Sequence, residues 1–259
     1  MMPLLMRTRN ESAVYFEQRI DATAALARLE AERARGKKLT FLHLVLHALG
    51  QMLAERPRLN RFVSGGRLWQ RRGIWVSFSA KKAFRDDAPI VVVKRRLDPA
   101  QALDQMVAEL SGELDEARSD RQSPTDKEVS LLLRLPHFLL SLAIGLARWL
   151  DSHGLMPLAM LRHDPFYASV FVANLGSLKI DAAYHHLYEY GTIPLFVTIG
   201  RFEDAVVAGP DGPVVTKRVV LKWSFDERTE DGLYCAAALE ILRRHLEDPA
   251  VIGTVRTAG

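Results

Sequence analysis

The sequence predicts a mixed α/β fold, and three observations support this prediction. Segments with the apolar spacing of helices alternate along the chain with short apolar segments typical of strands. The composition, with 48% hydrophobic and 25% charged residues, is that of an ordinary globular protein and excludes collagen-like and largely disordered proteins. Towards the C-terminal end, four apolar residues alternate with polar neighbours, which indicates a half-buried strand. These residues are Val219, Leu221, Trp223 and Phe225.

Two helices with clear boundary signals come first. Asp21 is the predicted N-cap of a helix that ends before Gly36. Thr40 is the predicted N-cap of a second helix over residues 41–55. This helix is expected to end before Pro57, because the residue before a proline disfavours the helical conformation.

Strand signals follow these helices. Residues 67–70 and 74–80 are predicted to pair as a hairpin, and residues 90–94 to form a short apolar strand. Asp98 is the predicted cap of a helix with Pro99 in its first turn. The apolar residues of this helix recur at helical spacing in one stripe, made of Leu103, Met106, Val107, Leu110 and Leu114.

An apolar segment from Val129 to Leu150 is the longest of the chain, and charged residues and a proline interrupt it. A spanning helix needs about 20 apolar residues with few charges. We therefore expect an apolar helical insertion around residues 125–160 that is buried or docks on a surface, with membrane contact as the less favoured alternative. The polar residues 119–126 are the best candidate for a linker before it.

The C-terminal half supplies two more predicted strands, over residues 167–174 and 194–200. The chain then closes with a predicted helix from about Asp231 to Leu246, which stops near Pro249.

Charge and cysteine content narrow the function classes. The net charge is +4, and the basic residues form small groups close to acidic residues. A nucleic-acid-binding protein more often shows one long basic stripe, so no nucleic-acid partner is expected. The single cysteine, Cys235, excludes an intramolecular disulfide and a cysteine-based metal cluster and fits the reducing cytoplasm. The apolar run at the start is too short for a signal peptide.

Two histidine pairs are candidates for chemistry. His43 and His47 share one helix face at a spacing that suits zinc, but no third ligand is evident, so packed histidines and no metal are expected. His185 and His186 lie among polar aromatic residues, which indicates either a lined pocket or a hydrogen-bonded loop. Histidine exchanges protons near neutral pH, so both stay candidate catalytic residues. Tyr190 stands where the acyltransfer motif HHxxxDG needs an aspartate.

Residues 226–232 follow a predicted strand and precede a helix, so they gather charge at a strand end. The pattern fits a functional site or a solvated loop with Asp231 as the helix cap. Cys235 falls among alanines on that helix, as expected for a small core residue rather than a nucleophile.

Six motifs run in order through nearly the whole chain. They are the helix Leu39–Leu42 with His47–Ala48 and its exit Arg56–Asn60; Trp75–Ala80 with Ala88–Val92; Val172–Gly176; Pro194–Gly200; Ser224–Arg228 with Asp231 and Gly232; and Glu247–Pro249. In this order and spacing the chain resembles the catalytic domain of the acyltransferase component of 2-oxo acid dehydrogenase complexes. It is more distantly similar to chloramphenicol acetyltransferase.

The resemblance implies one acyltransferase-like catalytic domain over residues 1–259, with a mixed sheet flanked by helices. It implies homotrimers or multiples of them, with an active site in a channel between subunits where coenzyme A and the second substrate meet. A histidine in the family motif D-H-R takes the thiol proton, and a hydroxyl in or beside the motif SNLG binds the oxyanion. No lipoyl or subunit-binding domain is expected, so a lipoyl-bearing protein would be another chain.

The departures from the family fall on these residues. Glu227 replaces the catalytic histidine, and a carboxylate with an ordinary pKa is a poor base for a thiol. The hydroxyl position falls on Ala173 or Asn174, of which only Asn174 can donate a hydrogen bond. Asp231 remains, and in the family this residue is implied to support local structure.

Three functions are therefore open. The first is a coenzyme A-dependent acyltransferase with a rearranged site, based on His185 or His186. The second is a catalytically silent relative, a pseudoenzyme, that acts as an oligomeric scaffold or regulator. The third is a membrane-peripheral protein that uses residues 129–150.

Overall fold

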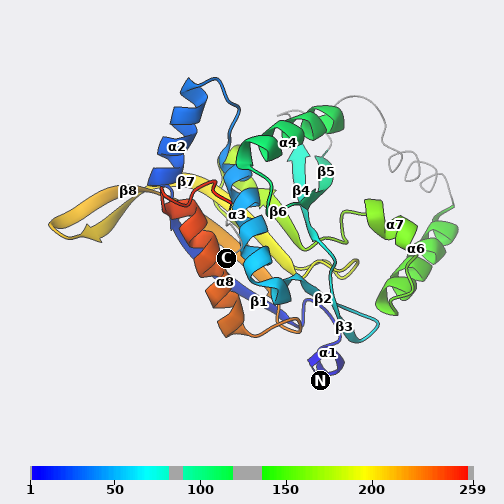
Figure 1. The fold of residues 1–259 in the computed structure, drawn as a ribbon. Coiled ribbons are helices and arrows are strands. Elements are labelled where there is room, and N and C mark those ends of the chain that lie inside the picture. The colour runs from blue at the N-terminus through cyan, green and yellow to red at the C-terminus, as the bar shows by residue number, and fades with distance from the viewer. Residues whose placement is uncertain (1, 82–89, 119–135, 256–259) are drawn as a thin grey trace.

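The computed structural model describes residues 2–81, 90–118 and 136–255. Its main feature is a six-stranded sheet in the order β1-β8-β7-β6-β4-β5 (Figure 1). The strands are β1 (Ala13–Asp21), β4 (Ile74–Lys81), β5 (Ile90–Leu97), β6 (Val170–Asn174), β7 (Leu195–Gly209) and β8 (Gly212–Asp226). The pairs β4–β6 and β6–β7 are parallel and the others antiparallel, so the predicted mixed α/β fold is confirmed.

Helices cover one face of this sheet (Figure 1). They are α2 (Thr23–Ala34), α3 (Phe41–Glu55), α4 (Leu103–Arg118) and α8 (Gly232–Glu247). Alternate strand residues such as Val76, Val197 and Trp223 point to these helices and form the main core with Leu49 of α3. Their neighbours point to the opposite face, where Phe171 and Phe196 pack with the loop residue Leu187 in a second cluster.

The predicted hairpin of residues 67–70 with 74–80 is wrong. Strand β3 (Arg67–Gln70) instead pairs with β2 (Arg61–Ser64), which the sequence analysis did not identify. Gly65 and Gly66 between them have φ values of 58° and 70°. A two-residue turn with positive φ at both positions matches strand twist, so the Gly-Gly pair fixes this register.

Two helix starts also differ from prediction. Ala22 rather than Asp21 is the N-cap of α2, although Oδ1 of Asp21 accepts a hydrogen bond from the amide of Thr23 at 2.9 Å. Helix α4 begins at Leu103, because Asp98 caps the preceding turn through the amide of Ala100.

The N-cap at Thr40 is as predicted, and His43 reaches back to it. The Thr40 amide donates to Nδ1 of His43 at 3.1 Å. His43 and His47 are both buried, and burial lowers the pKa of each to about 4. The described residues contain no group of three side chains able to hold a metal ion with them. Burial of both rings is what the interpretation as packed histidines expects.

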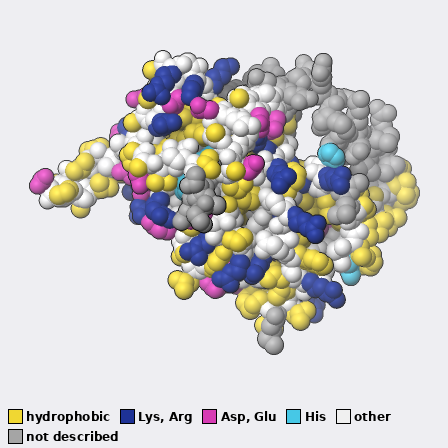
Figure 2. All heavy atoms as spheres, viewed as in Figure 1, with side chains coloured by type: hydrophobic (Ala, Val, Ile, Leu, Met, Phe, Trp, Pro, Cys, Tyr) yellow, Lys and Arg dark blue, Asp and Glu magenta, His cyan; other side chains and the backbone are white. Residues whose placement is uncertain are grey.

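The apolar insertion is helical in its described part, with α6 (His137–Ser152) and α7 (Leu158–His163). Helix α6 lies on the surface rather than in the core (Figures 1 and 2). Its exposed large apolar residues are Phe138, Leu139, Leu142, Ile144, Leu146 and Trp149. Within the described ranges, no helix has the length and hydropathy needed to span a membrane. The predicted linker at 119–126 lies outside the described residues.

A buried carboxylate joins the insertion to the edge of the sheet. Asp151 of α6 accepts hydrogen bonds from the Tyr167 hydroxyl at 2.6 Å and from the Gly191 amide at 3.0 Å. Gly191 has a φ of 85°, and a Cβ there would collide with the carbonyl of Phe166. Glycine is therefore required at this junction.

We predict that Gly191→Ala lowers the free energy of unfolding by about 1–3 kcal/mol, because the left-handed backbone and the collision both oppose a methyl group. Urea unfolding measures the change. The matched control is Gly112→Ala in α4, where a Cβ meets nothing within 4 Å. That variant should gain about 0.5–1 kcal/mol from helix propensity. Equal effects of the two substitutions would contradict this account.

Candidate functional site

The candidate site begins where β8 ends. Phe225 pairs with Leu195 at the start of β7, and the amide of Asp226 donates to the carbonyl of Pro194 at 2.9 Å. A short turn then leads into α8, whose N-cap is Asp231. Oδ1 of Asp231 accepts from the amide of Tyr234 at 2.8 Å, which is the capping role considered from sequence.

A buried ion pair holds this edge together. Nε and Nη2 of Arg228 donate to Oδ1 and Oδ2 of Asp226 at 2.8 and 2.7 Å. The Ser12 hydroxyl also donates to Asp226, at 3.0 Å. Nη1 of Arg228 donates to the carbonyls of Met6 and Arg7 at 3.2 and 3.3 Å. The pair therefore ties the N-terminal segment to the end of β8.

Glu227 lies between these two locked residues. Its amide donates to the carbonyl of Ser12 at 3.1 Å, so the backbone is fixed. The side chain is half-buried, and its carboxylate has no hydrogen-bond partner among the residues that the structure describes. The position that the resemblance assigns to a base thus presents an acidic group with no ion pair. Cys235 on α8 is buried, and burial raises the pKa of its thiol to about 12, as suits a core residue.

His185 packs beside the same edge. Its ring is stacked on Phe196 of β7, with ring centroids 4.0 Å apart. The hydroxyl of Ser224, on β8, donates to the backbone carbonyl of His185. His186 is exposed and stacks on the other histidine at 4.5 Å. The aromatic neighbours therefore hold one imidazole firmly and leave the other in solvent.

The hydrogen bonds of His185 define its protonation. Nδ1 lies 2.7 Å from the carbonyl oxygen of His186. A carbonyl oxygen only accepts, so Nδ1 carries the proton and Nε2 is the basic nitrogen. Burial lowers the pKa of His185, which keeps the ring neutral at physiological pH. A neutral imidazole with an unprotonated nitrogen can act as a general base.

The polar aromatic residues around the histidines have partners. The Tyr190 hydroxyl donates to Oδ2 of Asp164 at 2.7 Å. Tyr184 packs edge-on against Tyr15 at 5.8 Å, with Nζ of Lys222 4.7 Å from its ring centroid. These two tyrosines therefore contact residues outside the loop, on β1, on β8 and near the end of the insertion.

Ala173 and Asn174 lie at a different level of the sheet. Asn174 pairs with Ile199, which pairs with Leu221, several residues before the end of β8. Because a strand rises about 3.3 Å per residue, Leu221 lies roughly 15 Å along β8 from Asp226. One subunit therefore does not bring Asn174 and Glu227 together.

The amide of Asn174 is oriented by its own turn. Oδ1 accepts from the Ser177 amide at 3.2 Å, which leaves Nδ2 as the available donor. Two hydroxyls nearby were missed from sequence. Ser177 donates to the Asn174 carbonyl at 2.7 Å, and Thr198, paired with Ala173, donates to the Ala183 carbonyl at 2.6 Å. A serine three residues after an asparagine at a strand end is a signal for such a turn.

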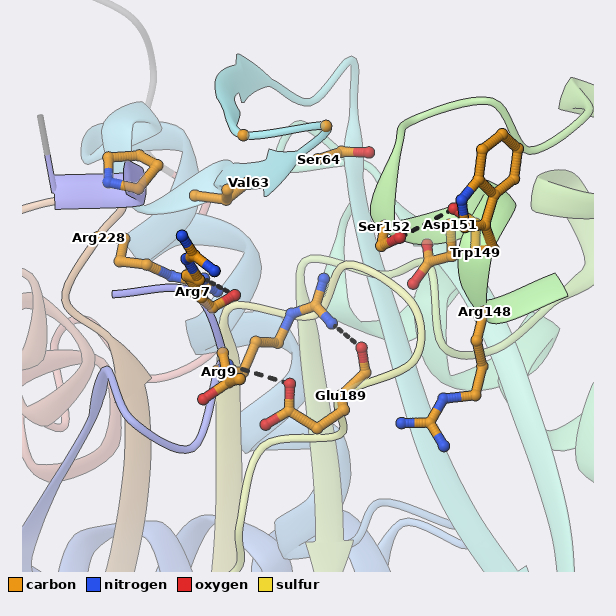
Figure 3. Close-up of a pocket in the computed structure, with 14 residues that line it drawn as sticks. Arg7, Arg9, Val63, Ser64, Arg148, Trp149, Asp151, Ser152, Glu189 and Arg228 are labelled. Carbon is orange, nitrogen blue, oxygen red and sulfur yellow. Dashed lines mark hydrogen bonds between the residues drawn. The ribbon is translucent and has the colours of Figure 1, made fainter. Parts of the chain in front are cut away.

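A pocket of about 540 Å³ adjoins Arg228 (Figure 3). Arg228, Arg7 and Arg9 lie on one side, and Arg148 and Asp151 of α6 contribute to the other (Figure 3). In the part of the chain that the structure describes, the guanidinium groups of Arg7 and Arg148 have no carboxylate partner. They could hold an anionic group. No sequence pattern pointed to this pocket, because its residues come from distant segments.

Glu189 lines this pocket, whereas neither His185 nor His186 does. Nη1 of Arg9 donates to the carbonyl of Glu189 at 2.6 Å, and the Glu189 carboxylate accepts from the Arg9 amide at 3.2 Å (Figure 3). The histidine loop is therefore joined to the pocket through Glu189. The hypothesis that a histidine lines a cavity near residues 226–232 stays a prediction.

By sequence, the chain matches no protein-family model and no curated protein. By structure, it is similar to the cubic core of the pyruvate dehydrogenase multienzyme complex, with a TM-score of 0.63 and 18% identity over 93% of this chain and 84% of that one. It is also similar to the dihydrolipoamide acetyltransferase of Azotobacter vinelandii, studied for the roles of a serine, a histidine and an asparagine in catalysis. The TM-score is 0.64, with 18% identity over 93% and 84% of the two chains.

Chloramphenicol acetyltransferase gives a TM-score of 0.54 with 12% identity, over 95% of this chain and 92% of that one. The six-stranded mixed sheet, its covering helices and the order of the motifs agree with this similarity. The chain therefore has the chloramphenicol acetyltransferase-like fold shared by the catalytic cores of 2-oxo acid dehydrogenase complexes.

Proposed function

We propose that the protein is a coenzyme A-dependent acyltransferase with an altered active site at the end of β8. The observation that carries the proposal is the neutral ring of His185, with Nδ1 bonded to a carbonyl and a basic Nε2. A thiol proton can pass to such a nitrogen. A carboxylate such as Glu227 accepts that proton poorly. Arg7 and Arg148 would bind the phosphates of coenzyme A, because arginine suits phosphate recognition.

The first test is calorimetric titration of coenzyme A and of acetyl-coenzyme A into the pure protein. Saturable binding supports the proposal of an enzyme. Loss of this binding in the Arg7→Gln variant would assign coenzyme A to the pocket beside Arg228. The absence of binding by the folded protein contradicts the proposal.

A second candidate is an inactive relative that acts as an oligomeric scaffold. The observation that favours it is that Glu227 occupies the position at which the resemblance expects the base, and that the hydroxyl position falls on Ala173 or Asn174, neither of which has a hydroxyl. A lipoyl-bearing protein would then be a binding partner rather than a substrate. Oligomer formation without binding of acyl-coenzyme A would favour this function.

We predict that Glu227→His alone does not create strong acetyl transfer to dihydrolipoamide, because the hydroxyl position, Ala173 or Asn174, would still lack a hydroxyl. Loss of one oxyanion donor costs about 10²- to 10³-fold in rate. The double variant Glu227→His/Ala173→Ser should exceed the single variant by about that factor. A spectrophotometric assay of thioester formation measures both. Robust turnover by the single variant would show that Glu227 was the only defect.

We predict that His185→Ala lowers any measured acyl transfer by about 10²- to 10⁴-fold, because it removes the general base. The matched control is His153→Ala, since Nδ1 of His153 also bonds a backbone carbonyl, at 2.8 Å, but at the end of α6. The wild-type rate should fall only below about pH 6.5, because the pKa of His185 lies under the ordinary histidine value. Full activity of the His185 variant would contradict the assignment.

We also predict a trimer or a multiple of it in solution. Asn174 and Glu227 lie on different levels of one sheet, so a second copy is needed to bring such groups together. The distal half of the β7–β8 hairpin projects as an arm with exposed valines, including Val206 and Val215 (Figures 1 and 2). Light scattering at micromolar concentration measures the mass. A stable monomer would contradict the prediction, and Val206→Asp should weaken the assembly.

A further inference from the structure

A second cavity, of about 460 Å³, lies on the sheet face opposite α3 and α8. Trp75 of β4 and Lys94 of β5 line it from the sheet. The end of the insertion covers this face, since the Ser77 hydroxyl donates to the carbonyl of Pro165 at 2.6 Å. The cavity is therefore built from the sheet and from the insertion that lengthens this chain.

One wall carries the guanidinium of Arg71, which has neutral hydrogen-bond partners in the described part of the chain. Nη2 of Arg71 donates to the carbonyl and hydroxyl of Thr192 at 3.0 and 2.8 Å, and Nη1 donates to the carbonyl of Tyr167 at 3.4 Å. All of these partners are neutral. Nε is buried without a hydrogen-bond partner. Within the described ranges, no carboxylate pairs with this guanidinium, and burial lowers the pKa of Arg71 to about 9.

Lys94 adds a second cation to the same cavity. Nζ donates to the carbonyls of Leu161 and Asp164 at 2.7 and 2.9 Å. An ammonium has three hydrogens, so one donor remains. Burial, followed by the charge of Arg71, lowers the pKa of Lys94 to about 8, and the carboxylate of Asp164 opposes this only in part.

The carboxylate in the lining, Asp151, does not balance the positive charges of Arg71 and Lys94. Asp151 faces this cavity as well, but its two oxygens accept from Tyr167 and Gly191. Its favourable charge interaction is with Arg9 rather than with Arg71. Both cations are half-buried, and in the described ranges Arg71 has no carboxylate partner while Asp164 offsets the charge of Lys94 only in part, which is costly away from solvent.

The lining also contains apolar residues and exposed cations. Phe62, Trp75, Met156 and Leu161 supply the apolar wall. Cζ of Arg71 lies 4.5 Å from the ring centroid of Phe62, and Nζ of Lys94 lies 5.4 Å from that of Trp75. The exposed cations Arg72 and Arg162 also belong to the lining and favour the approach of an anion.

We propose that this cavity binds a small amphiphilic carboxylate, with its carboxylate at Lys94 and Arg71 and its apolar tail along Trp75 and Phe62. The free hydrogen of Nζ donates to the ligand, and the ligand's charge compensates the buried guanidinium. The tail is stabilised by burial of apolar surface, which is worth about 0.8 kcal/mol per methylene group. Its lining does not include Glu227 and shares Ser64 and Asp151 with the pocket beside Arg228.

The test is calorimetric titration of octanoate into the full chain, with 1-octanol and acetate as probes of the tail and the charge alone. We expect saturable binding of one octanoate, and weaker binding of the other two. Lys94→Gln should weaken octanoate binding about tenfold or more, because it removes a charge-assisted hydrogen bond. The matched control is Arg67→Gln, which removes one exposed positive charge on β3 outside the cavity.

Arg71→Gln should weaken octanoate binding similarly, and circular dichroism establishes whether each variant folds. Because Arg71 also bonds Thr192, its variant could fail to fold, and the Lys94 variant then decides alone. The proposal is overturned if the folded wild-type protein shows no saturable octanoate binding. It is also overturned if 1-octanol binds as tightly as octanoate, or if the folded Lys94 variant binds octanoate as the wild type does.

Discussion

The bidentate pair of Asp226 and Arg228 is the interaction on which the arrangement of the candidate site depends. It fixes the end of β8, holds Ser12 and the carbonyls of Met6 and Arg7, and so places the N-terminal segment against the sheet. Both side chains are buried, and removing one partner of such a pair costs about 3–5 kcal/mol because the other charge is left unpaired. Glu227 contributes only its backbone to this network. The side chain at position 227 is therefore not part of the contacts that hold this edge together.

Much of the fold followed from the sequence, because its strongest signals are local. The alternation along β8, the capping of α3 at Thr40 and the positive φ at Gly36 each act within a few residues. The pairing of β2 with β3 was missed, although the Gly65–Gly66 turn signals it, because the next strand offered a competing partner. Strand β1 was missed because it is an edge strand with few buried residues, so its apolar pattern is weak.

The candidate site was less predictable, because it is assembled from distant segments. Sequence motifs identified residues 226–232 and the histidine loop, which Ser224 does join to β8. Sequence motifs do not give the register in which strands pair. They could not show that Asn174 lies at another level of the sheet from Glu227. The arginine pocket and the Arg71 cavity depend on contacts between the insertion and the sheet edge. A contact of this kind leaves no periodic signal in the chain.

Asp151 belongs to the walls of both cavities, and its two oxygens hold the Tyr167 hydroxyl and the Gly191 amide in place. The same side chain therefore contacts the contents of both cavities. If an occupant of one cavity displaces the carboxylate, it changes the affinity of the other cavity, and thermodynamic reciprocity requires an equal factor in the reverse direction. The insertion thus supplies more than a cover for the sheet. It also places one carboxylate in the walls of both cavities.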